Sequence, residues 1–219
     1  MSNSQGNDEE SNVLKLITPV FTPSSSPDES AAVRSTIKSL SLIEHVEGGH
    51  FAVTDVSSTT VPSPYPSTPL SQRTIDLAGG LPADFDPSLR RLSTTIFYYL
   101  TPNRPQGSFH RNRSRIIHSL HRGRGRYVLI HPEGRVESFV VGHDVERGER
   151  LQWVVEGDVW KASFLLADVD GQSGSDGLLI SETVVPGFEY ADHEFLTNER
   201  LVEILPDAKA KALEWLVKH

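Results

Sequence analysis

The hydrophobic and polar positions first follow a helical period and then a shorter, strand-like one. Residues 26–29 read SPDE, which is typical of a helix start, and apolar side chains then recur at the spacing of one helix face. We therefore expect a helix over about residues 27–42. Paired glycines at positions 48 and 49 indicate a turn into a strand over residues 50–56.

From residue 93 onward, short apolar runs alternate with Gly, Pro and Asp. The runs that predict strands cover residues 94–100, 116–121, 126–130, 136–141, 151–155, 161–166 and 178–185. Their even spacing favours an antiparallel sandwich or barrel over alternating strands and helices. After Pro206 and Asp207, apolar positions form one stripe up to Leu216, which predicts a C-terminal helix.

Two stretches lack periodicity. Residues 1–26 are rich in Ser, Asn, Pro and acids, and we expect a disordered acidic tail there. Residues 57–72 are dominated by Ser, Thr and Pro and predict a loop. The remainder, residues 27–219, is expected to form a single domain.

Composition excludes several kinds of chemistry. The chain has 219 residues, 37% of them hydrophobic, which is enough for a core, and it has no cysteine. Disulfides, thiolate nucleophiles and cysteine metal sites are therefore excluded. The acidic, polar N-terminus does not resemble a signal peptide, and no apolar run approaches the roughly 20 residues that span a bilayer. We expect a soluble, cytoplasmic protein that does not bind membranes.

The net charge hides a local inversion. Lys and Arg total 21 against 29 Asp and Glu, a net charge of −8, which argues against nucleic acid as a partner. The segment from Arg104 to Arg126 nevertheless holds seven arginines, three histidines and no acid. This basic stretch is the first indication of a binding site. Its last part, in which Arg122, Arg124 and Arg126 alternate with glycines, lacks the interleaved aromatics of a nucleic-acid tract.

Several segments, in order, resemble the Cupin-5 family of the cupin superfamily. They are residues 44–51 (EHVEGGHF), 93–100 (STTIFYYL), 110–123 (HRNRSRIIHSLHRG), 160–162 (WKA) and 184–188 (VVPGF). The resemblance spans about residues 40–205, with a loop insertion at about 57–91. It implies an all-β, double-stranded β-helix of the jelly-roll type with an N-terminal and a C-terminal helix. It also implies a homodimer with a pocket in the barrel mouth, but no particular reaction.

The departures from the cupin pattern concern the metal site. Ile116 stands where the resemblance places the metal-binding glutamate, Asn112 stands at the second metal position after His110, and Trp160 or a neighbour stands at the last histidine. One histidine does not hold Fe, Mn or Ni, which need three or four convergent ligands. We therefore expect no metal and no cofactor.

Four residues are candidates for proton transfer. Strand alternation places His118 on the same face as Ile116. If the position of the family's metal-binding glutamate, here Ile116, faces the barrel interior, then His118 faces inward as well, next to His110. Imidazoles exchange protons near neutral pH, although each could instead bond a backbone carbonyl. Tyr98 or Tyr99 could donate a proton, as a tyrosine does in cupin-fold sugar epimerases, or simply pack. Glu182 is the only charge between residues 177 and 186 and is either edge-exposed or a site group with a raised pKa.

Other residues are candidates for substrate binding. Arg111 and Arg115 would donate hydrogen bonds to a carboxylate, phosphate or enolate oxygen of the substrate. Alternatively, they form a solvated basic rim or a dimer contact, in which they pair with acidic side chains from the rest of the chain. Glu47 would close the pocket or cap its turn. Aromatic side chains are expected to line the barrel, namely Trp160, Phe164 and Tyr127.

These residues favour a metal-independent cupin enzyme that transfers protons on a small anionic or enolisable organic molecule. The reaction class is an isomerisation, epimerisation, dehydration or cyclisation, and we expect it to belong to secondary metabolism. A non-catalytic small-molecule-binding cupin is one alternative. Another is a metal-dependent cupin with relocated ligands, namely His110, His118 and Glu182.

Overall fold

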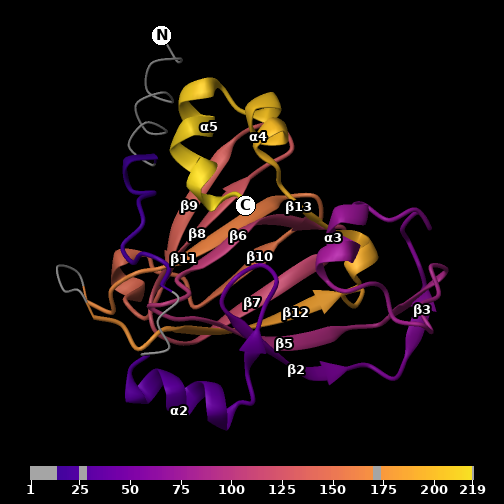
Figure 1. The fold of residues 1–219 in the computed structure, drawn as a ribbon, viewed down its shortest axis with the longest axis horizontal. Helices are drawn as coiled ribbons and strands as arrows, with labels where there is room; N and C mark the ends of the chain where they lie inside the picture. The colour runs from indigo at the N-terminus through magenta and orange to yellow at the C-terminus, as the bar shows by residue number, and fades with distance from the viewer. Residues whose placement is uncertain (1–13, 25–28, 170–173, 219) are drawn as a thin grey trace.

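The computed structural model describes residues 14–24, 29–169 and 174–218. Two antiparallel sheets face each other (Figure 1). The six-stranded sheet has the order β1 (Ile43–Glu44), β2 (His50–Val56), β5 (Thr94–Leu100), β12 (Leu178–Val185), β7 (Arg115–Arg122) and β10 (Gln152–Val155). The five-stranded sheet has the order β13 (His193–Phe195), β6 (Gln106–Asn112), β11 (Trp160–Leu165), β8 (Gly125–Ile130) and β9 (Val136–Val141). The two sheets confirm the predicted all-β jelly-roll class.

Helices cover the outer faces of both sheets. Helix α2 (Ala31–Ser39) packs Val33 against Tyr99 of the six-stranded sheet, and Figure 1 shows α4 (Asn198–Ile204) and α5 (Asp207–Leu213) on the five-stranded sheet. The core therefore consists of three apolar clusters. One cluster lies between the two sheets, one lies between the five-stranded sheet and helices α4 and α5, and a smaller one lies between the six-stranded sheet and α2.

Most predicted elements are present, with differences at their ends. Helix α2 begins at Ala31, because the Ser30 side chain accepts a hydrogen bond from the Val33 amide and caps it there. Positions 27 and 28, where we expected it to begin, lie outside the described residues. The apolar pattern missed the strands β1, β6 and β13 and the helix α4. Strand β6 has no apolar alternation, because its inward side chains include the polar Ser108 and His110.

The two stretches without periodicity, residues 1–26 and 57–72, contain more ordered structure than the predicted tail and loop. Residues 1–13 of the predicted tail lie outside the described residues, but Ile17 is buried in the core under α4 and α5. The insertion contains β3 (Thr60–Pro62), α3 (Gln72–Leu77) and β4 (Leu89–Arg91), and β3 pairs with β4 as a separate two-stranded sheet. Among the described residues, no helix has both the length and the apolar character needed to cross a membrane.

Candidate active site

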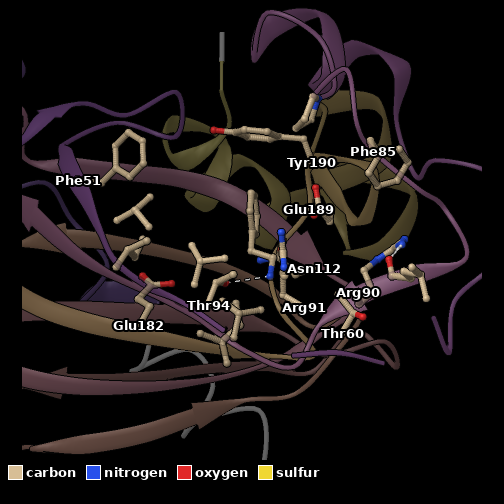
Figure 2. A pocket seen from close by; sticks show the side chains of 18 of the residues that line it. Phe51, Thr60, Phe85, Arg90, Arg91, Thr94, Asn112, Glu182, Glu189 and Tyr190 are labelled. Carbon is tan, nitrogen blue, oxygen red and sulfur yellow. Dashed lines mark hydrogen bonds between the residues drawn. The ribbon is translucent and has the colours of Figure 1, made fainter. Parts of the chain in front are cut away.

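A cavity of about 610 Å³ lies between the inner face of the six-stranded sheet and the insertion (Figure 2). Strands β2, β5, β7 and β12 supply a largely apolar wall, with Phe51, Ile96 and Ile116 among its members. The insertion contributes Phe85 and Arg90 at the opposite end from Glu182 (Figure 2). The charged side chains that reach the cavity from the barrel interior are Glu47, Lys161 and Glu182. An apolar cavity with a few convergent polar groups is typical of a small-molecule site.

A buried lysine connects the two sheets at the cavity wall. Lys161 of β11 is 3% exposed, and its Nζ donates to Oε2 of Glu182 in β12 at 2.8 Å and to Nε2 of His118 in β7 at 3.2 Å. Glu182 and His118 are directly opposite each other across the β12–β7 pair, so their side chains share the inner face. The three side chains form one charge-assisted hydrogen-bonded group.

The protonation of this group follows from its burial and its charges. Burial alone would raise the pKa of Glu182, but the ammonium of Lys161 and the His118 imidazole outweigh it and hold the pKa below its usual range. Neither alternative considered for Glu182 is therefore found, because the side chain is buried rather than edge-exposed and its pKa is lowered rather than raised. Burial lowers the pKa of His118, although Glu182 opposes that shift. At neutral pH Glu182 is thus a carboxylate and His118 a neutral imidazole.

Three histidines surround the carboxylate of Glu47. Oε1 of Glu47 lies 2.9 Å from Nε2 of His193 and 3.3 Å from Nε2 of His110, and Oε2 lies 3.6 Å from Nδ1 of His45. Burial alone would raise the pKa of Glu47, but His110, His45 and the hydrogen bond from His193 lower it well below its usual value. Glu47 is therefore a buried anion.

The paired glycines bring Glu47 to this position. Gly48 has a φ of +113°, and a Cβ there would meet the carbonyl oxygen of Gln106 at 2.0 Å. Only glycine lets the turn lie this close to β6 with that backbone conformation. The Ser108 amide donates to the Glu47 carbonyl at 2.8 Å and fixes the turn against the strand that carries His110.

Six of the predicted site residues converge. Glu47, Tyr98, His110, Tyr127 and Glu182 surround a small internal void beside the cavity, and His118 lies against Tyr127. Neither predicted imidazole lines the cavity itself: His110 lies behind Glu47, and His118 lies behind Lys161 and Glu182. Tyr98 faces inward as alternation allowed, and its hydroxyl donates to the Gly48 carbonyl at 2.9 Å.

Two of the three predicted aromatic wall residues lie elsewhere. Trp160 and Phe164 belong to the cluster under α4 and α5, so the prediction that they line the barrel interior is wrong. Strand β11 is buried on both faces, because the C-terminal helices cover its outer side. Its apolar pattern therefore does not reveal which face is inner, and Lys161 occupies the inner one.

The two predicted arginines also lie outside the cavity. Arg111 lies 4.8 Å over the Trp160 ring and pairs with Glu194 at 2.7 Å, on the outer side of the sheet. Arg115 is more than half exposed and pairs with Glu156 at 3.2 Å. Both arginines pair with acids, as our alternative interpretation expected, and the cation inside the barrel is Lys161.

Sequence reasoning missed Lys161, His193 and His45 as site residues. Lys161 carries the only charge in the run from residue 159 to 167, which is the same signal that identified Glu182. The sequence carries no comparable signal for His193, which β13 places opposite Asn112 of β6. His45 precedes Glu47 in the family turn and reaches the cavity.

The usual cupin metal position does not fit a metal in this chain. Asn112 and Ile116 line the cavity there, and the inward-facing neighbour of Trp160 is the ammonium of Lys161. An apolar side chain and a cation do not ligate a metal ion. The relocated set His110, His118 and Glu182 does not fit either, because Lys161 already donates to both His118 and Glu182.

This fold and cavity define the chain as a cupin. The family model of the cupin superfamily named Cupin_5 (DUF985) matches residues 34–196, and the chain belongs to this family. The uncharacterized protein YML079W of Saccharomyces cerevisiae is 42% identical over 87% of this chain and 88% of its own length.

Two solved structures share the fold over nearly their whole length. A hypothetical protein from Leishmania major has a TM-score of 0.66 and 29% identity, with 85% of this chain and 98% of that chain covered. Protein SO0799 from Shewanella oneidensis has a TM-score of 0.63 and 26% identity, with 87% and 98% covered. These relatives support the family and the fold, and their names state no activity.

Proposed function

We propose that this cupin is an enzyme that binds a small anionic or enolisable organic molecule in its cavity and moves a proton on it. The reaction class is isomerisation, epimerisation, dehydration or ring closure, with no metal at the usual cupin position. The observation that carries the proposal is the ammonium of Lys161 at the cavity wall, hydrogen-bonded to Glu182. It provides positive charge where metal-binding members of the fold have a ligand to their ion.

The two charged groups have complementary roles in this proposal. A carbonyl or carboxylate oxygen of the substrate accepts a hydrogen bond from Nζ of Lys161, which stabilises the negative charge that develops when a carbon-bound proton leaves. Glu182 lines the same cavity and accepts that proton. The apolar wall excludes water and strengthens both interactions.

Substrate binding would itself make Glu182 a better base. The ammonium of Lys161 is the strongest influence that lowers the pKa of Glu182, and burial opposes it. An oxyanion that shares this ammonium weakens the Lys161–Glu182 attraction, while burial remains, so the pKa of Glu182 rises toward the working pH. His118, which accepts a hydrogen bond from Lys161, is a positioning residue for the ammonium.

Deuterium incorporation distinguishes an enzyme from a binder. Small carboxylates and oxo acids that raise the melting temperature are incubated with the protein in heavy water, and the carbon-bound label is measured by mass spectrometry. We expect labelling by wild type and a loss of roughly 100-fold or more in Glu182→Gln, which keeps the shape of the side chain. Glu203→Gln alters an exposed ion pair and serves as the control. A ligand that stabilises the protein but gains no label would establish a binder instead.

A further inference from the structure

The carboxylate of Glu47 is buried, and the partners that the structure gives it are imidazoles. A buried carboxylate requires compensation by hydrogen bonds and by positive charge. His193 supplies one hydrogen bond through Nε2, at 2.9 Å from Oε1. A neutral imidazole supplies no charge, so compensation must come from a proton or from a cation held at this place.

The tautomer of His110 leaves Nε2 without a hydrogen, and this atom faces Oε1 of Glu47. Nδ1 of His110 lies 2.8 Å from the carbonyl oxygen of Ser108, which accepts only, so Nδ1 carries the hydrogen. Nε2 of the neutral ring then presents a lone pair, 3.3 Å from Oε1 of Glu47. It is buried and has no hydrogen-bond partner. Two acceptors thus face each other, which is unfavourable unless a positive ion lies between them.

The ring of His110 is held in this orientation. Its side chain is 5% exposed, and its Nδ1 lies 2.8 Å from the Ser108 carbonyl oxygen. The Nδ1 hydrogen bond to a backbone carbonyl is also the arrangement that orients metal-binding histidines and fixes Nε2 as the ligand atom.

We propose that Glu47, His110 and His193 bind one divalent transition-metal ion through a carboxylate oxygen and two Nε2 atoms. When the ion binds, the hydrogen that Nε2 of His193 donates to Glu47 is replaced by the ion, and the ring carries its hydrogen on Nδ1, which has no hydrogen-bond partner. The three ligand atoms lie within 4.8 Å of one another, and all three residues are buried. Two histidines and one carboxylate are a donor set that suits first-row ions such as Zn²⁺, Fe²⁺ and Co²⁺. The set shares only His110 with the usual cupin position, and it leaves Lys161, His118 and Glu182 unused.

The site would remain open on the cavity side. Glu47 lines the cavity, whereas His110 and His193 lie behind it, so a bound ion would face the cavity past the carboxylate. The ion would hold a second oxygen of an anionic ligand opposite Lys161. The proposal does not depend on the proton-transfer function, because metal binding is measured without any substrate.

Metal binding by the full-length protein tests the site. Chelator-treated protein is titrated near neutral pH with Zn²⁺ by calorimetry and with Co²⁺ by visible absorption. We expect one ion per chain, d–d bands typical of nitrogen and oxygen ligands, and a higher melting temperature with metal. Glu47→Gln and His193→Ala should each weaken metal binding by more than about 100-fold. The loss of a residue that only hydrogen-bonds to a metal ligand already lowers the metal affinity by about 10–100-fold.

A matched control and a second readout keep the test decisive. His131→Ala removes another histidine that contacts a glutamate, Glu137, outside the cavity, and binding should not change. The melting temperature of each metal-free variant shows whether it folds, and the wild-type Co²⁺ spectrum reports the ligands without any variant. Wild type that binds no ion at millimolar metal would overturn the proposal, as would folded Glu47 and His193 variants that bind as wild type does. Metal binding without deuterium exchange would count against the proton-transfer function alone.

Discussion

Lys161 and Glu182 are each the only charge in an otherwise uncharged strand, and the fold buries them against each other. Such a pair is expensive to desolvate and contributes little net stability, but removal of one partner leaves an uncompensated charge. The pair is therefore better explained by a role in the cavity than by stability. His118 adds to this pair, because its Nε2 accepts a hydrogen bond from Nζ of Lys161.

We expect Glu182→Gln to lower the free energy of unfolding by about 3–5 kcal/mol near neutral pH, because Lys161 is left buried without its anion. The pKa of Glu182 in the folded state lies below its ordinary value of 4.5, so its contribution is present above that pH and is lost as the pH falls. The difference between wild type and variant should therefore be constant above about pH 5.5 and shrink steadily as the pH falls below about 5. Urea denaturation across this range measures it.

Glu203→Gln is the control for this measurement. Its carboxylate pairs with Arg200 on the surface of α4, and both side chains are more than half exposed. Such a pair contributes about 0–1 kcal/mol, so the variant should follow wild type closely at every pH. A constant difference between Glu182→Gln and wild type over the whole range would contradict the lowered pKa.

At the scale of elements, the insertion forms the outer wall of the cavity. It is held by Arg90 of β4, whose Nε and Nη2 donate to Asp192 at 2.6 and 3.1 Å, with both side chains buried. This bidentate pair connects β4 to the segment that precedes β13. The same aspartate also accepts from Arg113 at 3.0 Å, so it keeps a cationic partner if Arg90 is replaced.

We expect Arg90→Met to loosen the insertion without unfolding the barrel. Amides of β3 and β4 should exchange with deuterium at least about tenfold faster, because a buried pair is worth more than the ~1.4 kcal/mol that a tenfold change requires. Amides of β8 and β11 should keep their rates. Hydrogen exchange followed by mass spectrometry measures both, with Arg135→Met as the control at an exposed arginine. Equal acceleration in β8 would show that Arg90 supports the whole fold.

At the scale of the whole molecule, the positions of the arginines show how the net charge of −8 is distributed. The basic stretch includes Arg111, Arg113 and Arg124, which pair with Glu194, Asp192 and Glu149 from other parts of the chain. These three arginines are therefore paired with acids from other parts of the chain rather than gathered into an anion site. The cationic group of the cavity interior comes from outside the stretch, at Lys161.

The homodimer expected from the family resemblance stays a prediction, and the structure suggests where to look for it. Strand β1 is an edge of the six-stranded sheet, and Ile43, Val53 and Val56 expose apolar side chains on β1 and its neighbour β2. We expect light scattering to give the mass of two chains, and Ile43→Asp to shift the mass toward one chain. Leu77→Asp, at an exposed apolar residue of α3, is the control. Wild type with the mass of one chain at every concentration would contradict the expectation.

The sequence by itself determined most strands, the family and part of the site. Alternation within β7 correctly placed His118 on the inner side with Ile116, and the isolated charge in β12 identified Glu182. These inferences succeeded because the period of a strand relates residues within a few positions of each other. The departures from the cupin pattern likewise drew attention to Asn112 and Ile116, and both side chains line the cavity.

Only the tertiary structure decided which side chains meet across the barrel. Glu47 and His193 are 146 residues apart and meet because the glycine turn and β13 both lie against β6. Strand β11 is buried on both faces, so its inner face, and with it Lys161, was settled by the helices that cover the other side. Local periodicity fixes faces relative to one strand, whereas contacts between sheets depend on strand order and packing, which no local pattern contains.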